Sequence, residues 1–180
     1  GESFYRIANV DGMDDFFISV VSDSNHWMFI STRGGLSAGR TDCDSALFPY
    51  YTEDKIRDNS DNTGSRTIVI ADQGGKRMLW EPFSRSHTGI YSITRNLYKN
   101  VLGDKLIFEE TNHDLGLQFT YSWSTSDRFG FVKQSTIASI GNTESAVEIL
   151  DVIDNSLPYG VLAGSQNELS CLGPFPPGQP

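Results

Sequence analysis

Hydrophobic and polar residues alternate in short runs along most of the chain, as they do in half-buried β-strands. These runs are rich in β-branched and aromatic residues and are bounded by Gly, Asp, Asn and Ser. The three-and-four spacing of an amphipathic helix is almost absent. In the first half of the chain the pattern predicts four strands, at Phe16 to Val21, Trp27 to Ser31, Thr67 to Ala71 and Met78 to Glu81.

Longer strands are predicted after Gly89. The turn sequences VLGD, HD, DR and IGNTE separate segments of about ten residues, the last of which is SAVEILDVIDN. This order predicts a meander of long antiparallel strands that ends near Asn155. Strands of this length form large, curved sheets, and large antiparallel sheets pack face to face. The predicted fold is therefore all-β, a large two-sheet antiparallel β-sandwich with less than about a tenth of its residues in α-helix.

One segment of the meander has an apolar face and a hydroxyl-rich face. The hydroxyl-rich face carries Gln, Thr and Ser, and the apolar face consists of Leu117, Phe119, Tyr121 and Trp123. Neighbouring side chains of a strand point to opposite faces of the sheet. We therefore expect the four apolar residues to point into the core between the two sheets.

The stretch from Gly34 to Gly64 lacks this regularity and predicts a long irregular loop, polar at both ends, with LFPYYTEDKI in its middle. Irregular segments longer than about fifteen residues are uncommon and often functional. After Cys171 the sequence LGPFPPGQP is rich in residues that disfavour sheets and helices. The predicted organisation is a β-sandwich domain at residues 1–171, followed by a Pro/Gly-rich linker or tail at 172–180.

The net charge argues against two classes of partner. The chain of 180 residues has 23 acidic and 14 basic side chains, which gives a net charge of −9 and repels nucleic acid phosphates and anionic lipid surfaces. No apolar run approaches the ~20 residues of a membrane-spanning helix. We therefore expect neither nucleic acid nor a membrane as a partner. Cys43 and Cys171 match no metal-ligand spacing, and whether they form a disulfide stays open.

The histidines do not predict a catalytic or metal site. The adjacent His113 and Asp114 fit a turn better than a base with its orienting carboxylate, and His26 and His87 lack the spacing of metal ligands. The sequence contains no nucleophile elbow, phosphate loop or dinucleotide fingerprint. We expect no catalytic residue, no metal and no cofactor.

Pairs of acidic residues and exposed aromatic residues are the other candidate sites in the sequence. Glu109 and Glu110 are neighbours on a strand, so their side chains diverge and do not form the facing pair of a glycosidase. The segments DCD and DNSDN crowd oxygen ligands without following the order of a calcium loop. Exposed aromatic rings stack on sugars, although most aromatic residues of a sandwich are buried. The candidate platforms are Trp27, Trp80, Tyr50, Tyr51 and Tyr98.

Several segments resemble those of a known family in their residue types and in their order along the chain. The aromatic strand ends in SDRFG, and GNTESAVEILDVIDN follows it, while FFISVVSDSNHWMFIST, GGLSAGR and ALFPYYTEDKI lie in the first part of the chain. With these segments the chain from Phe4 to Val161 resembles the N-terminal β-sandwich of large carbohydrate-active proteins of the cellobiose phosphorylase and cyclic glucan synthase type.

The resemblance implies a galactose-mutarotase-like supersandwich that precedes a linker and a C-terminal catalytic (α/α)₆ barrel of the same parent chain. The implied partners are that barrel, an oligo- or polysaccharide, and a second copy in a homodimer. The resemblance also implies a role for the Gly34 to Gly64 loop in contacting carbohydrate or a partner chain. Alternatively, ALFPYY plugs one end of the sandwich. The candidate contact residues are Arg40, Asp42, Asp44, Tyr50 and Tyr51.

The function that this resemblance implies is a non-catalytic module of a larger glycoside phosphorylase or related enzyme. Such a module contributes to carbohydrate binding, active-site shaping or dimerisation, and by itself it is not expected to be an enzyme. A free-standing carbohydrate-binding sandwich of lectin type is the alternative. A mutarotase-like enzyme is less favoured, because that chemistry needs paired histidines and a glutamate around an open sheet face.

Overall fold

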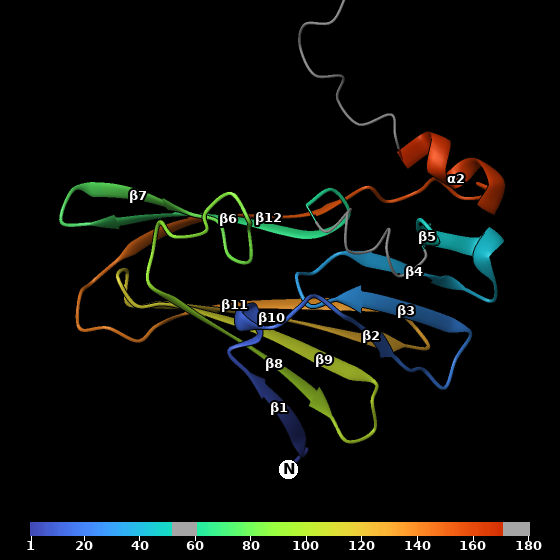
Figure 1. Ribbon diagram of the computed structural model, residues 1–180, viewed down its shortest axis with the longest axis horizontal. Helices are drawn as coiled ribbons and strands as arrows, with labels where there is room; N and C mark the ends of the chain where they lie inside the picture. Colours follow the sequence, from blue (N-terminus) through green and yellow to red (C-terminus); the bar gives the residue numbers. More distant parts are fainter. Residues whose placement is uncertain (52–60, 171–180) are drawn as a thin grey trace, which may run out of the picture.

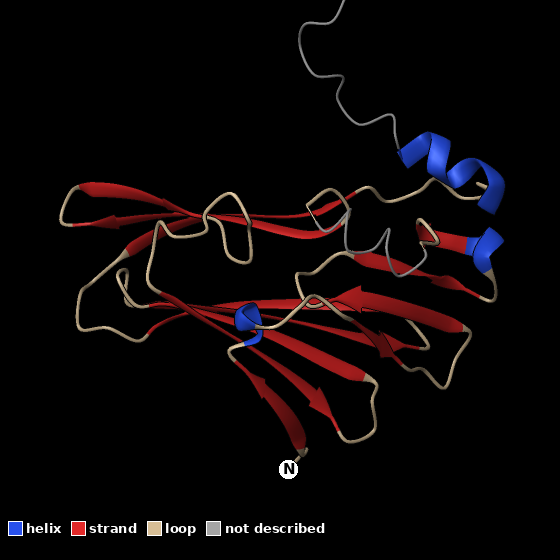
Figure 2. Ribbon diagram, viewed as in Figure 1, coloured by secondary structure: helices blue, strands red, loops and turns tan. Residues whose placement is uncertain are grey.

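The computed structural model describes residues 1–51 and 61–170, with the side chains of 1–51 and 61–166. Strand makes up 54% and helix 6% of it, so the predicted all-β class is confirmed (Figure 2). Within the described residues, no helix has both the length and the apolar character needed to cross a membrane. The predicted linker or tail at 172–180 lies outside these residues.

The largest sheet has five antiparallel strands and forms one layer of the structure (Figure 1). Its order is β1-β8-β9-β10-β11. Strands β8 to β11 are the predicted meander, which is confirmed, whereas the edge strand β1 was not predicted. The bounds are β1 (Phe4–Ala8), β8 (Ile93–Asn100), β9 (Lys105–Asn112), β10 (Leu117–Ser126) and β11 (Gly130–Ser139).

Two smaller antiparallel sheets complete the structure, so there are three sheets where the sequence predicted two, and their arrangement is consistent with the predicted β-sandwich. One has four strands in the order β2-β3-β4-β5, and the other has three in the order β12-β6-β7. The four strands predicted in the first half of the chain are present as β2, β3, β6 and β7. The bounds are β2 (Phe17–Val20), β3 (His26–Ser31), β4 (Leu36–Arg40), β5 (Ala46–Phe48), β6 (Gly64–Gln73), β7 (Lys76–Trp80) and β12 (Ala146–Asp154).

The two smaller sheets meet at one isolated antiparallel bridge, between Gly35 and Gly64. Gly34 and Gly64 have positive φ angles of 91° and 121°, and a Cβ on Gly64 would lie 2.4 Å from the carbonyl oxygen of Gly34. Glycine is the residue that permits this backbone approach. Beyond this bridge and the neighbouring hydrogen bond from the Leu36 N–H to the Thr63 carbonyl oxygen, β4 and β6 belong to separate sheets.

Strand β12 does not continue the meander, and this part of the prediction was wrong. It pairs antiparallel with β6 over its whole length, with Ala146 opposite Asp72 and Asp154 opposite Gly64. The segment between β11 and β12, residues 140–145, is longer than the two-residue loop of a tight hairpin. This length lets the chain cross from the five-stranded sheet to the three-stranded one.

A polar contact ties β12 to the five-stranded sheet below it. Asp151 accepts hydrogen bonds from Lys133 Nζ, from Ser135 Oγ at 2.8 Å and from Thr67 Oγ1 at 2.7 Å. Burial by itself raises the pKa of Asp151, but the hydrogen bonds from Lys133, Thr67 and Ser135 outweigh it and lower the pKa. Asp151 is thus a charged link between the layers.

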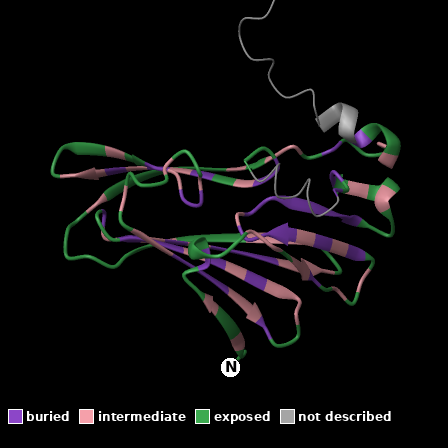
Figure 3. Ribbon diagram, viewed as in Figure 1, coloured by how far each residue is buried: buried purple, intermediate pink, exposed green. Residues whose placement is uncertain are grey.

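The core lies between the five-stranded sheet and the two smaller sheets (Figure 3). The predicted apolar face of β10 points into it, with Phe119, Tyr121 and Trp123 only 2%, 3% and 2% exposed. Tyr121 stacks on Phe108 with ring centroids 4.6 Å apart, and Trp123 meets Phe48 of β5 edge to face. The predicted orientation of β10 is therefore confirmed.

The prediction of an irregular loop from Gly34 to Gly64 was wrong in its first part. Residues 36–48 form β4, the short 3₁₀ helix η2 (Cys43–Ser45) and β5. Small residues hid the strand pattern of LSAGR, yet Leu36 and Ala38 are core residues, 1% and 0% exposed. Residues 52–60 lie outside the described part of the chain.

Replacement of Trp123 by Ala tests the placement of the core. Loss of this buried ring should lower the free energy of unfolding by about 3–5 kcal/mol, since it leaves a cavity beside Phe48. The measurement is urea denaturation followed by circular dichroism. Phe129→Ala is the matched control, because Phe129 is 72% exposed, and its effect should stay within about 0.5 kcal/mol. An unchanged midpoint for Trp123→Ala contradicts the assigned core.

Candidate functional site

The structure gives the five site residues predicted from the sequence different surroundings. Arg40 is exposed at the end of β4. Asp42 caps η2 by accepting a hydrogen bond from the Asp44 backbone N–H, and Asp44 accepts one from the Ala163 N–H at the start of α2 (Ala163–Ser170). The two carboxylates thus stabilise local backbone.

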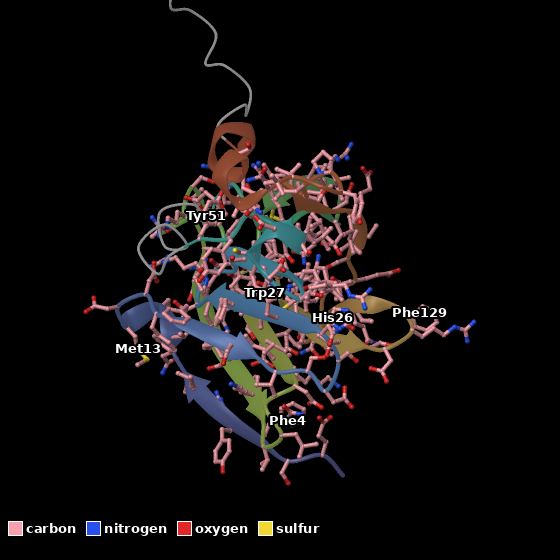
Figure 4. The ribbon with its side chains drawn as sticks, turned by 90° about the vertical axis from the view of Figure 1, so that its right-hand side faces the viewer. Phe4, Met13, His26, Trp27, Tyr51 and Phe129 are labelled. Carbon is pink, nitrogen blue, oxygen red and sulfur yellow. The ribbon has the colours of Figure 1, made fainter. Side chains whose placement is uncertain are left out.

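The two predicted tyrosines face opposite environments. Tyr51 is 5% exposed, whereas Tyr50 is 49% exposed. Ser37 Oγ fixes this segment from β4, since it donates to the Pro49 carbonyl oxygen and accepts from the Tyr51 N–H. In Figure 4, Tyr51 is labelled below helix α2. Tyr51 fits the plug that the sequence allowed as the alternative, and Tyr50 stays available for contact.

Gln166 is an anchor of this region that the sequence did not reveal. Its side chain is 1% exposed; it accepts from the Tyr50 N–H at 2.8 Å and donates to the Cys43 carbonyl oxygen at 2.6 Å. These bonds dock α2 on the segment around β5. No sequence motif marks such a glutamine, because its partners are backbone atoms more than a hundred residues away.

Four aromatic side chains form a continuous row on the outer face of the four-stranded sheet, which we call the aromatic row. Neighbouring ring centroids are 5.9 Å apart between Phe17 and Phe29, 6.2 Å between Phe29 and Trp27, and 5.5 Å between Trp27 and Tyr50. Phe17 and Tyr50 are exposed, and the two rings between them are half-buried. The row therefore presents aromatic surface to solvent across β2 and β3 as far as Tyr50.

The strand register explains why these rings lie outside the core. On β3 the side chains of His26, Met28 and Ile30 are buried, so those of Trp27 and Phe29 point to the opposite face. A sequence pattern contained this signal, because two aromatic residues occupy alternate positions of NHWMFIS. Trp27 and Tyr50 are among the aromatic platforms predicted from the sequence, whereas Phe17 and Phe29 are not.

Gly39 of β4 gives Trp27 its position. Gly39 is directly opposite Trp27 in the ladder, and a Cβ on Gly39 would lie 2.6 Å from Trp27 Cζ2. The indole therefore packs against the bare backbone of β4, and its Nε1–H donates to the Asp42 carbonyl oxygen at 3.1 Å. The rings at the two ends of the row stand nearly perpendicular to their neighbours, at 82° for Phe17 and 81° for Tyr50.

The other aromatic platforms suggested by the sequence are not available. Trp80 is 1% exposed and donates its Nε1–H to a glutamate. Tyr98 is half-buried and donates its hydroxyl to Glu109, while Arg6 lies over its ring. Burial of the hydroxyl raises the pKa of Tyr98, and its bond to Glu109 adds to this shift.

His26 lies on the core side of β3, directly before Trp27 (Figure 4). Its side chain is buried, and neither ring nitrogen has a hydrogen-bond partner among the described residues. Its ring packs edge to face on Phe131 at 5.1 Å. Burial lowers the pKa of His26, the positive charge of Arg40 lowers it further, and Asp127 acts in the opposite direction. Neutral histidine is therefore the form that the fold stabilises.

A polar cavity of about 260 Å³ lies at the end of β6, away from the aromatic row. Arg66 donates to Glu81 at 2.7 Å, and this hydrogen bond raises the pKa of Arg66. Arg33 is paired with Asp15 at 2.8 Å. Both arginines of the cavity lining are therefore already paired with carboxylates. The lining includes Arg33, Asp61, Thr63, Arg66, Glu81, Ser84, Ser86 and Asp154.

Glu110 forms a buried network behind this cavity. Its carboxylate, 1% exposed, accepts hydrogen bonds from Arg95 Nε at 2.7 Å, Trp80 Nε1 at 2.8 Å and the Phe83 N–H at 2.6 Å. Phe83 has a positive φ of 64°, which is costly for a residue with a side chain. The bond from Phe83 to Glu110 holds the backbone in this conformation.

The remaining candidates from the sequence have structural roles in the described residues. His113 and Asp114 lie in the turn after β9, where His113 Nε2 contacts Thr94 Oγ1 and Asp114 accepts from the Ser92 N–H. Glu109 and Glu110 diverge, as predicted. In residues 1–51 and 61–170, no group of three His, Cys, Asp or Glu side chains is arranged to hold a metal ion.

Comparison with known proteins does not extend these observations. No family model matches the chain, and no curated protein matches it closely enough to be treated as a relative. The resemblance to the β-sandwich of cellobiose phosphorylase-type proteins stays a prediction.

Glu110→Gln tests the buried network. The substitution keeps the shape of the side chain but leaves the Arg95 guanidinium without a counter-charge in the core. Removing one partner of a buried ion pair should cost about 3–5 kcal/mol of unfolding free energy. Glu148→Gln breaks the exposed pair with Arg77 and should cost less than about 1 kcal/mol. Equal effects of the two variants in urea denaturation contradict a stabilising network.

The burial of His26 predicts a pH dependence of stability. The folded state lowers the pKa of His26 from the 6.5 of a free histidine, so its contribution is present above about pH 6.5 and is lost as the pH falls through the folded pKa. His26→Phe should abolish this part of the loss. The check is the fall in Tm between about pH 7.5 and about pH 5.5, which should be larger in the unmodified chain than in the variant. Equal falls show that His26 does not titrate on unfolding in this range.

Proposed function

We propose that this chain is a non-catalytic carbohydrate-binding β-sandwich domain, and that the aromatic row is its binding surface. The observation that carries the proposal is the row itself, with four neighbouring rings on the outer face of one sheet. Soluble proteins place most large aromatic side chains in the core. A partly exposed row of them therefore indicates a contact surface.

The chemistry of the row suits sugar rings. A pyranose has an apolar face of C–H groups and an edge of hydroxyls, so it packs against an aromatic face while its edge stays hydrogen-bonded. Asp42 is exposed beside Trp27, and Ser19 of β2 is opposite Phe29 in the ladder. Both residues offer oxygen partners for hydroxyls at the margin of the rings.

The shape of the row favours a chain of sugars over a single one. Three rings follow one another across β2 and β3, and Tyr50 is the fourth, so one monosaccharide would contact only part of the row. We therefore expect an oligo- or polysaccharide as the ligand. Neutral glycans fit better than acidic ones, because the net charge of −9 repels anions.

The sequence resemblance supports the proposal that this domain is a module of a larger glycoside phosphorylase or related enzyme. In that enzyme the catalytic (α/α)₆ barrel performs the reaction. In this proposal the domain helps to hold the polysaccharide for the barrel. A free-standing, lectin-like domain with the same binding surface is the alternative, and it makes the same prediction for the row.

Affinity electrophoresis in gels that contain neutral polysaccharides tests the proposal. We expect retardation by at least one soluble α-glucan, β-glucan or xylan, and Trp27→Ala should lose it. The removed ring contributes about 1.5–3 kcal/mol by area burial, which corresponds to a roughly tenfold to hundredfold weaker Kd. Calorimetry with oligosaccharides of the retarding polymer then gives the Kd values.

Two controls accompany this experiment. Phe129→Ala removes an exposed ring outside the row and should leave binding unchanged, and thermal melts should show that Trp27→Ala is folded. If no neutral polysaccharide retards the chain, or if folded Trp27→Ala binds as well as the unmodified chain, the aromatic row is not a carbohydrate site.

A further inference from the structure

Strand β12 is an edge strand that is apolar and exposed. It is the outer member of the sheet β12-β6-β7, and its burial pattern shows exposure along most of its nine residues (Figure 3). Among its side chains Val147, Ile149, Leu150 and Ile153 are 37%, 46%, 56% and 44% exposed. Soluble proteins usually protect long apolar edges with lysine, proline or a covering segment.

The register shows that part of this edge belongs to the core face. Val147 and Ile149 are opposite Ala71 and Val69 of β6, which are both 0% exposed. All four side chains therefore project toward the five-stranded sheet. The two on β6 are buried, whereas the two on β12 are not, because no strand among the described residues lies on the outer side of β12. A further strand beside β12 would cover them.

We propose that β12 pairs antiparallel with β12 of a second copy of this chain, so that two three-stranded sheets join into one of six strands. A two-fold axis perpendicular to the sheet generates this pairing and keeps core-facing residues on the core side in both copies. The backbone N–H and C=O groups on the outer edge of β12, which pair with no strand in the described part of the chain, supply the hydrogen bonds. This inference does not depend on carbohydrate binding.

The sequence of β12 is complementary to itself in one register. With the axis at Leu150, all nine residues pair, and Val147 is then opposite Ile153 of the second copy. Glu148 is opposite Val152, and Ile149 is opposite Asp151, so no two acidic residues face each other.

A shift of the axis to Asp151 breaks this complementarity. Asp151 would then face Asp151 of the second copy, and Glu148 would face Asp154, which opposes like charges across the strands. An axis at Ile149 opposes no acids but leaves the last two residues of β12 without a strand partner. Charge and length together therefore favour the register centred on Leu150.

Sedimentation equilibrium of the whole chain at about 0.15 M salt, where charge repulsion is screened beyond about 8 Å, tests the proposal. We expect a species of twice the 20.0 kDa chain mass. Ile149→Lys with Leu150→Lys should convert it to monomer, because charges in the interface oppose association. Leu102→Lys is the control; Leu102 is 75% exposed in the turn after β8, and this variant should stay dimeric.

Cysteine cross-linking tests the register without depending on the lysine variants. In a background with Cys43→Ser and Cys171→Ser, Leu150→Cys should form a disulfide-linked dimer under mild oxidation, because opposed Cβ atoms lie about 4.5–5.5 Å apart. Glu148→Cys should not, since its two copies are offset by four residues, or about 13 Å. A chain that sediments as monomer, a dimer that survives the double lysine change, or equal cross-linking at both positions overturns the proposal.

Discussion

The arrangement of the layers depends on the hydrogen bonds that the buried carboxylate of Glu110 accepts. It lies on β9 of the five-stranded sheet, and it binds Trp80 at the end of β7 in the other layer. It also binds Arg95 of β8 and the backbone of Phe83. A buried charge costs several kcal/mol unless each of its lone pairs is satisfied. Since these partners come from both layers, the charge is stable only when the layers are correctly apposed.

The same network shapes the chain after β7. Phe83 adopts a positive φ while its ring packs edge to face on Phe108 and Tyr121 of the core. Pro82 and Phe83 are buried, and Glu81 and Ser84 beside them line the polar cavity. The backbone strain is thus compensated by a charge-assisted hydrogen bond and by aromatic packing. The buried network of Glu110 thus positions part of the lining of the polar cavity.

On the outer face of the four-stranded sheet, the exposure of the aromatic rings is the property that indicates function. Gly39 removes a side chain at the position where Trp27 lies, and Ser37 holds the segment that carries Tyr50. These small residues keep the rings in contact without covering them. Rigid placement lowers the entropy lost on binding a ligand, which is consistent with a preformed contact surface.

The pattern of residues along the chain predicts most strands of this protein, but not β1, β4 or β5. Alternation identified the meander from β8 to β11 and the inward face of β10, because the period of two is a property of the backbone. It did not determine which sheet a strand joins. Strand β12 has the composition of a meander strand, but after a six-residue connection it pairs with β6, where Thr67 also donates a hydrogen bond to Asp151.

The candidate site, too, could be predicted from the sequence only in part. The residue types of Trp27 and Tyr50 were visible in the sequence, and so was the alternation that places Phe29 with Trp27 on one face. Only the tertiary structure decided that this face is the outer one, that Tyr51 is buried, and that Asp42 and Asp44 stabilise backbone. The reason is physical: side-chain direction follows from local geometry, whereas exposure depends on what packs against each face, and those contacts join residues far apart in the chain.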